Sequence, residues 1–266
     1  MIIIGEKINA TRKAIAAAIG ARDEQHILKT AREQIEAGAN YLDLNGGDPK
    51  PGGEEANMQW LVTLVQANFP DVPLCLDSAN PKAMEVGLKL AKLKPIVNSV
   101  SLEKERLELF LPILSRHECM VVALCMADEG MPTGAEDRVA RAGKLIAALT
   151  AAGKKVEEII IDPCFFPVSA EPKSAVQVCQ AIAQIKANHP GVHIGGGLSN
   201  TSYGLPARKY LNFAMVAACV YHGMDAAIID PCSHPIVPIM LAGEVLTGVD
   251  EWCANWVGAH RAGKIQ

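Results

Sequence analysis

The hydrophobic residues of this chain fall into short aliphatic runs that alternate with longer amphipathic segments. A buried parallel strand gives a run of β-branched or aliphatic residues, whereas a helix covering a sheet has apolar residues every three or four positions. The chain repeats this pair eight times. The runs that predict strands are residues 2–4, 41–44, 73–76, 95–97, 120–125, 159–161, 192–194 and 226–229.

Each run is followed by a segment with helical spacing. The predicted helices are residues 23–37, 54–68, 81–90, 103–116, 135–152, 174–188, 208–222 and 235–246. Asn80 before Pro81 is typical of a helix start, and Gly38 and Gly153 are typical of helix stops. Eight such units predict an α/β fold, a (β/α)8 TIM barrel, rather than a doubly wound open sheet, because no early Gly-x-Gly-x-x-Gly motif occurs.

The pattern predicts a single domain over residues 1–266, since no linker, repeat or low-complexity tract divides the chain. Residues 250–266 predict a C-terminal helix that packs on the barrel or on a second subunit, with Trp252 and Trp256 on one face.

Composition fits one large aliphatic core, because half of the residues are hydrophobic and only 5% are aromatic. A net charge of -4 argues against a nucleic-acid or membrane partner, both of which need clustered Lys and Arg. The eight cysteines form no Cys-x-x-Cys pair and indicate buried thiols in a reducing compartment. No apolar run reaches the roughly 18 residues of a membrane span, so we expect a cytoplasmic protein.

Polar residues gather where the predicted strands end, which is where a barrel of this type carries its active site. The candidates are Glu6, Asp43, Asn45, Asp77, Asn98, Asp162, Gly196, Gly197, Ser199, Asn200 and Asp230. Burying so many acids is costly unless they accept hydrogen bonds from a ligand or from one another. Alternatives remain open: the four Asp residues could cap turns or helices, and Glu6 could pair with Lys7 or Arg12.

A ligand with an amino-pyrimidinone edge would complement these acids and amides. A carboxylate accepts two parallel N–H bonds, and Asn side chains can hydrogen-bond carbonyls and ring nitrogens. The run Gly195-Gly196-Gly197 lets the backbone approach a flat ligand at which Asn200 points its amide. A structural turn is the alternative for this run. Metal catalysis is not expected, since no His-Glu-x-x-His or paired ligand spacing occurs, and no Ser-His-acid set is evident.

Taken together, these segments resemble the methyltetrahydrofolate:corrinoid methyltransferases, which are pterin-binding barrels related to dihydropteroate synthase and to the folate domain of cobalamin-dependent methionine synthase. The resemblance covers essentially the whole chain. The segments that carry it are residues 4–9 (IGEKIN), 42–45 (LDLN), 76–78 (LDS), 97–99 (VNS), 161–163 (IDP), 197–200 (GLSN) and 224–228 (MDAAI).

The resemblance implies that Asp77, Asn98 and Asp162 hold the pyrimidine edge of the pterin, and that Asn200 lies beside nitrogen 5. It further implies that Gly196, Gly197 and Ser199 line the ring and that Arg208 lies near the mouth. We expect Glu6, Asp43 and Asn45 to belong to the same pocket. It also implies a homodimer and a corrinoid (cobalamin) carried by a separate protein, because no cobalamin module is present in 266 residues.

The implied reaction moves a methyl group between nitrogen 5 of tetrahydrofolate and a corrinoid cobalt, in either direction. An amide has no proton to give near neutral pH, so Asn200 would hydrogen-bond nitrogen 5 while water in the network of Asp77 and Asp162 supplies protons. Dihydropteroate synthase is the alternative, weakened because its Lys-x-Arg signature is replaced by Asp230-Pro231-Cys232. A folate-binding protein without turnover is the second alternative.

Overall fold

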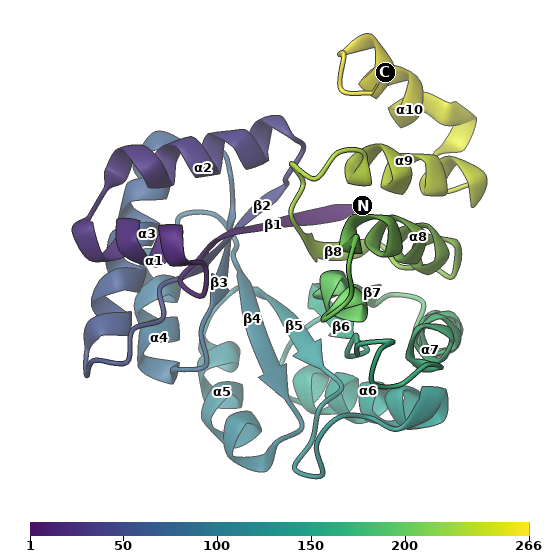
Figure 1. Cartoon of the computed structure of the whole chain (residues 1–266). Coiled ribbons are helices and arrows are strands. Elements are labelled where there is room, and N and C mark those ends of the chain that lie inside the picture. The colour runs from purple at the N-terminus through teal and green to yellow at the C-terminus, as the bar shows by residue number, and fades with distance from the viewer. Residues whose placement is uncertain (266) are drawn as a thin grey trace.

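Eight parallel strands surround the centre of the molecule in a computed structural model that describes residues 1–265 (Figure 1). Their order in the sheet is β7-β6-β5-β4-β3-β2-β1-β8. The strands are β1 (Ile2–Asn9), β2 (Tyr41–Asn45), β3 (Leu74–Asp77), β4 (Ile96–Ser101), β5 (Met120–Leu124), β6 (Ile159–Asp162), β7 (His193–Ile194) and β8 (Ala226–Ile229).

The sheet closes into a barrel between its two end strands. The backbone N–H of Asp225 donates to the carbonyl of Ile194 (3.1 Å), and that of Ile228 donates to the carbonyl of Gly196 (3.0 Å). A Cβ on Gly195 would lie 2.0 Å from the carbonyl oxygen of Ala226, so only glycine lets β7 come this close to β8. The predicted (β/α)8 barrel is therefore confirmed.

Helices cover the outside of the strands in chain order (Figure 1). Eight of them match the sequence prediction to within one residue at every end. They are α2 (Glu24–Glu36), α3 (Gly53–Asn68), α4 (Pro81–Leu90), α5 (Lys104–Arg116), α6 (Gly134–Ala151), α7 (Ser174–Asn188), α8 (Arg208–Tyr221) and α9 (Ile236–Leu246).

The helix ends agree with the chemistry of their sequences. The side chain of Asn80 accepts a hydrogen bond from the N–H of Lys82 (2.9 Å), with Pro81 as the first helical residue. Gly38 and Gly153 follow α2 and α6 with φ of +105° and +90°, a conformation that favours glycine.

Two apolar cores result. The smaller one fills the barrel and contains Ile4, Cys75, Ile96, Met120, Val122, Ile160 and Ala226. The larger one lies between the strands and the surrounding helices and includes Leu76, Met84, Phe110, Leu145 and Ile182. Strands with aliphatic residues on both faces, as the sequence pattern requires, separate these two cores.

Three sequence predictions need correction. Strand β1 continues to Asn9, with an irregularity in its pairing between Gly5 and Ile8. A short helix that the pattern analysis missed, α1 (Lys13–Ala21), follows it. Trp252 lies in a 3-10 turn, η3 (Glu251–Cys253), with a left-handed φ of +58° and 95% exposure, so it does not share a helical face with Trp256.

The C-terminal helix α10 (Ala254–Arg261) contacts α9 at the outside of the barrel. Six of the eight cysteines are buried as expected, whereas Cys232 is half-buried and Cys253 is exposed. None of the helices among residues 1–265 combines the length and the apolar character needed to cross a bilayer.

Candidate active site

Four polar side chains stand at one level of four neighbouring strands. Asn9 of β1 pairs in register with Asn45 of β2, and Asp77 of β3 pairs with Asn98 of β4. Parallel strands place their C-terminal ends at the same rim of the barrel, so these residues form a polar arc directly above the apolar core inside the barrel. The sequence prediction of a polar rim is thereby realised for β1 to β4.

Asp77 is the centre of this arc. Its Oδ2 accepts hydrogen bonds from Nδ2 of Asn45 (2.9 Å) and from Nδ2 of Asn9 (3.4 Å). Burial raises the pKa of Asp77, while the amide of Asn45 and the positive charge of Arg106 oppose the rise. Oδ1 is left for a hydrogen-bond donor outside the arc.

Asp43 lies two residues below Asn45 and is only 1% exposed. Its Oδ1 accepts a hydrogen bond from Nδ2 of Asn98 (3.2 Å). Burial, together with the charge of Asp77, raises the pKa of Asp43 well above its ordinary value. Because the NH2 group of Asn98 faces Asp43, its carbonyl oxygen is free to accept a hydrogen bond from a ligand.

Asp162 ends β6 and faces the glycine run after β7. Its Oδ1 accepts from the N–H of Cys164 (2.8 Å), and the backbone N–H of Gly197 also lowers the pKa of this carboxylate. Burial raises the pKa of Asp162 to about 6 despite these two donors. The turn interpretation of Asp162 is thus correct for one of its oxygens.

The loop that carries Asp162 is fixed by Arg138 of α6, which is 2% exposed. Its Nε donates to the carbonyl of Pro163 (2.8 Å) and its Nη2 to the carbonyl of Cys164 (3.3 Å). Such a buried cation is stabilised by the carbonyls that surround it. Sequence analysis did not single out Arg138, although an arginine on an apolar helix face was the available signal.

After β7 the chain forms a 3-10 turn, η2 (Leu198–Ser202), that holds Asn200 at the surface. The side-chain NH2 of Asn200 lies 3.2 Å from the position of a Cβ on Gly197, and its backbone N–H donates to the carbonyl of Gly197 (3.1 Å). Asn200 is therefore close to the segment that contacts Asp162, and solvent can reach it.

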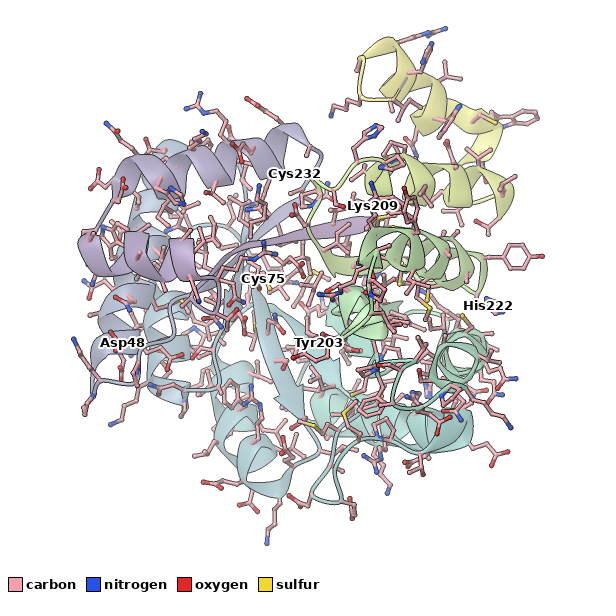
Figure 2. The ribbon with its side chains drawn as sticks, viewed as in Figure 1. Asp48, Cys75, Tyr203, Lys209, His222 and Cys232 are labelled. Atoms are coloured by element: carbon pink, nitrogen blue, oxygen red, sulfur yellow. The ribbon has the colours of Figure 1, made fainter. Side chains whose placement is uncertain are left out.

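Arg208 at the start of α8 braces this turn. Its Nη2 donates to the carbonyl of Ser199 (2.6 Å), and its Nε donates to Oγ of Ser202 (3.0 Å). Figure 2 shows Tyr203, the residue after η2, near the middle of the view together with Cys75 of the barrel interior. The predicted residues Ser199, Asn200 and Arg208 are thus brought together, with the carbonyl of Ser199 as the contact.

Glu6 and Asp230 have local partners. Glu6 lies 3.4 Å from Nη2 of Arg12, and burial raises its pKa while Arg12 opposes the rise. The side chain of Asp230 accepts from the N–H of Cys232 (3.0 Å), which fits the turn interpretation. The charges of Asp230 and Arg208 also act on the pKa of Glu6, so Glu6 belongs to the same rim.

Arg106 of α5 is a site residue that sequence analysis missed. Its Nε and Nη2 donate to the carbonyl of Ser99 (3.0 and 2.7 Å), next to Asn98, and its charge opposes the rise that burial causes in the pKa of Asp77. Only the fold brings the first turn of α5 over the ends of β3 and β4. In the sequence, Arg106 stands three residues after a predicted helix start, and that position did not indicate a place in the site.

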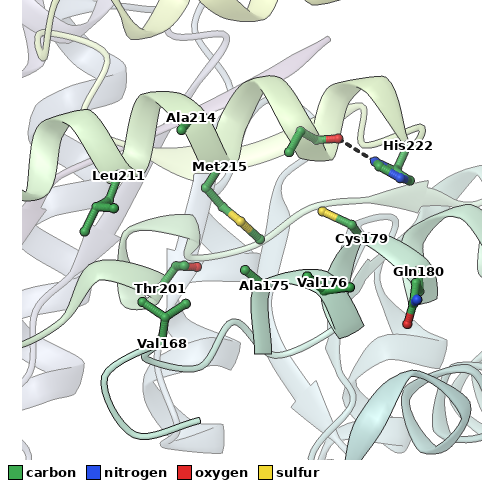
Figure 3. Close-up of a pocket in the computed structure, with 11 residues that line it drawn as sticks. Val168, Ala175, Val176, Cys179, Gln180, Thr201, Leu211, Ala214, Met215 and His222 are labelled. Carbon is green, nitrogen blue, oxygen red and sulfur yellow. Dashed lines mark hydrogen bonds between the residues drawn. The ribbon is translucent and has the colours of Figure 1, made fainter. Parts of the chain in front are cut away.

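A separate apolar groove of about 500 Å³ lies between α7 and α8, outside the barrel (Figure 3). Cys179, Thr201 and Met215 line its middle, and His222 lies at one end with Nδ1 2.8 Å from the carbonyl of Ala218. It contains none of the acids of the rim. Among residues 1–265 no three His, Cys, Asp or Glu side chains are grouped to hold a metal ion.

Comparison with known proteins shows the family of this chain. A family profile described as pterin binding enzyme matches residues 5–230. The chain is 34% identical over 267 residues to a methylcorrinoid:tetrahydrofolate methyltransferase of Eubacterium limosum, covering 100% of this chain and 98% of that protein. It is 31% identical over 242 residues to methionine synthase of Mycobacterium tuberculosis, covering 86% of this chain and 20% of that protein.

Solved structures with the same fold include dihydropteroate synthases. That of Coxiella burnetii in complex with pteroic acid superposes with a TM-score of 0.71 at 15% identity, covering 94% of each chain. That of Burkholderia cenocepacia with 7,8-dihydropteroate gives a TM-score of 0.68 at 18% identity, covering 93% of this chain and 92% of the other. Identities this low establish the barrel alone.

Proposed function

Because this chain belongs to the pterin-binding enzyme family, we propose that its rim of acids and amides binds the pterin of tetrahydrofolate for methyl transfer to or from a corrinoid. The chain is a methyltransferase of the class that acts on tetrahydrofolate and corrinoid substrates. The observation that carries this conclusion is the full-length 34% identity to a methylcorrinoid:tetrahydrofolate methyltransferase.

Three side chains would recognise the pyrimidine edge of the pterin. Asp162 and the free oxygen of Asp77 accept N–H bonds, and the carbonyl oxygen of Asn98 accepts another because its NH2 group is held by Asp43. A pterin has several N–H donors along one edge, so a set of acceptors is the complementary surface. Buried carboxylates without such donors would be costly, which supports a ligand of this kind.

Gly196 and Gly197 would line the ring. A Cβ at Gly196 would overlap the carboxylate of Asp162, so only a glycine backbone fits beside this acid at the edge of the proposed ligand site. The carbonyl of Ser199 accepts a hydrogen bond from Arg208, which keeps the turn in place.

Asn200 would lie beside nitrogen 5, where charge develops during methyl transfer. Its amide can hydrogen-bond that nitrogen without transferring a proton to it, and its exposure leaves the methyl group open to a second reactant. Protons would pass through water held by Asp77 and Asp162. The corrinoid supplies the cobalt that accepts or gives the methyl group.

The corrinoid would arrive on a separate protein, since the mouth lies open beside Asn200. A homodimer is also part of the proposal. The apolar α7–α8 groove, with Val176 59% exposed and Leu211 39% exposed, supports it as an uncovered apolar surface on which a second copy could pack. We further propose a cytoplasmic location, where thiols such as exposed Cys253 stay reduced.

A spectral assay tests the function in both directions. The protein would be mixed with methyltetrahydrofolate and cob(I)alamin, or with methylcobalamin and tetrahydrofolate, while the cobalt absorbance is followed. We expect turnover in at least one direction. Binding of tetrahydrofolate without turnover, even with a corrinoid protein added, would favour the non-catalytic folate-binding alternative. Condensation of p-aminobenzoate with a pterin pyrophosphate would favour the dihydropteroate synthase alternative.

A further inference from the structure

Asp77 is held by two asparagines that use the same local geometry on different strands. Asn45 of β2 and Asn9 of β1 each direct Nδ2 at the same oxygen, Oδ2 of Asp77, at 2.9 and 3.4 Å. Three elements that are far apart in the sequence therefore meet at one carboxylate oxygen. The other oxygen of Asp77 receives neither amide.

In both asparagines the amide orientation is set by the residue two positions later. Oδ1 of Asn45 accepts from the N–H of Gly47 (3.1 Å). Oδ1 of Asn9 accepts from the N–H of Thr11 (3.0 Å) and also from Oγ1 of Thr11 (2.7 Å). With the oxygen of each amide held in an Asx turn, only the NH2 group can face Asp77.

The charges around Asp77 make the hydrogen bonds from these amides important for its ionisation. Glu54 of α3 places negative charge near it, whereas Arg106 of α5 is the cation that acts on it. Burial also disfavours the ionised carboxylate. The amide of Asn45 opposes both effects without adding a charge that would compete with the ligand, and Asn9 directs a second N–H at the same oxygen.

We propose that Asn9, oriented by Thr11, is a positioning residue that keeps Asp77 ionised and turns its free oxygen toward the folate. This inference rests on the proposed function only for the identity of the ligand. Asn9 acts through Asp77 and has no role of its own in the chemistry. The distance of 3.4 Å between Nδ2 of Asn9 and Oδ2 of Asp77 is long for a hydrogen bond, and we expect it to shorten when Asp77 binds the ligand.

The test separates the amide donor from the turn. Asn9→Ser keeps an oxygen that can accept from the N–H of Thr11 but removes the NH2 group that reaches Asp77. Thr11→Val removes the hydroxyl that orients Asn9, and Thr11→Ser is its matched control, because it restores that hydroxyl. Asp77→Ala provides the background in which Asn9 has no carboxylate to position.

The first readout needs no folate. Selective 13C labelling of Asp carboxyls lets the pKa of Asp77 be followed by NMR in the whole unliganded protein, with Asp77→Asn assigning the signal. We expect that pKa to rise in Asn9→Ser, to rise less in Thr11→Val and to stay unchanged in Thr11→Ser. An unchanged pKa in Asn9→Ser would overturn the proposal.

The second readout is the dissociation constant for tetrahydrofolate from calorimetry. We expect about 5-fold weaker binding in Asn9→Ser, about 3-fold in Thr11→Val and no change in Thr11→Ser. Adding Asn9→Ser to Asp77→Ala should weaken binding no further; an equal additional loss would mean that Asn9 acts independently and would overturn the proposal. If the pKa shifts as expected while the wild type fails to bind tetrahydrofolate, the positioning role stands and the proposed function fails.

Discussion

Gly196 lies so close to Asp162 that a Cβ on Gly196 would be 2.1 Å from Oδ2 of that carboxylate. Real Cβ atoms do not come so near to an oxygen, so a side chain at position 196 must displace Asp162 or the turn after β7. The triple glycine that stood out in the sequence therefore has a specific role at its second position. It allows the backbone of one strand end to cover the buried acid of its neighbour.

The first prediction is that Gly196→Ala weakens tetrahydrofolate binding at least about 10-fold, because Asp162 is pushed out of its position. Titration calorimetry measures the effect. Gly20→Ala in α1 is the control: no atom lies within 4 Å of a Cβ there, so binding should be unchanged and stability should rise by up to about 1 kcal/mol. Binding by Gly196→Ala within twofold of the wild type would contradict the assignment of Asp162.

The second prediction concerns the pH dependence of stability. Burial raises the pKa of Asp162 from 3.8 to about 6, so the folded state holds this proton more tightly than the unfolded state. Stability from this group is full below pH 3.8 and is lost as pH rises through about 6. The loss amounts to about 3 kcal/mol, and Asp162→Asn should remove this part of the decline. Urea unfolding between pH 4 and 8 measures it, and equal slopes in both proteins would refute it.

The same substitution should affect the ligand. If the ionised carboxylate accepts pterin N–H bonds, the affinity of the wild type for tetrahydrofolate should increase as pH rises through about 6. Asp162→Asn should bind more weakly and lack this inflection. An unchanged dissociation constant at pH 7.5 would count against a pterin role for Asp162.

The third prediction is that Asn200→Ala lowers turnover about 10²- to 10³-fold while tetrahydrofolate still binds, because its hydrogen bond to nitrogen 5 matters most as charge develops. The cobalt absorbance assay measures turnover and calorimetry measures binding. Tyr203→Phe, on the exposed residue after the turn, is a neighbouring control that should keep full activity. Undiminished turnover in Asn200→Ala would remove Asn200 from the mechanism.

The fourth prediction concerns closure of the barrel. Asp225 accepts from Nζ of Lys186 (2.7 Å) and the N–H of Ile194 (2.8 Å), and lies 3.1 Å from Nδ1 of His193. Burial alone would raise its pKa, but these partners lower it below 3.8, so the stabilisation is present above that pH and is lost in acid. Asp225→Ala should lower the free energy of unfolding at pH 7 by about 1–2 kcal/mol. An equal effect in the exposed control Asp71→Ala would contradict a specific role.

The sequence by itself determined the number and order of the strands, nearly all of the helices, and the rim at which the acids and amides lie. These features depend on periodicity, capping and the position of polar residues after aliphatic runs, all of which are local. It missed α1, an alanine-rich segment of nine residues whose apolar face is short. It also misplaced Trp252, because a left-handed residue interrupts the expected helix.

Only the tertiary structure decided which polar groups act on one another. The register of β1 with β2 and of β3 with β4 joins Asn9, Asn45, Asp77 and Asn98 into one arc, and the packing of α5 brings Arg106 to it. The fold buries Asp43 and Asp162, whereas other acids of the chain remain exposed to solvent. A hydrogen bond depends on atomic positions to within a fraction of an ångström, and those positions are fixed by contacts between residues that lie far apart along the chain.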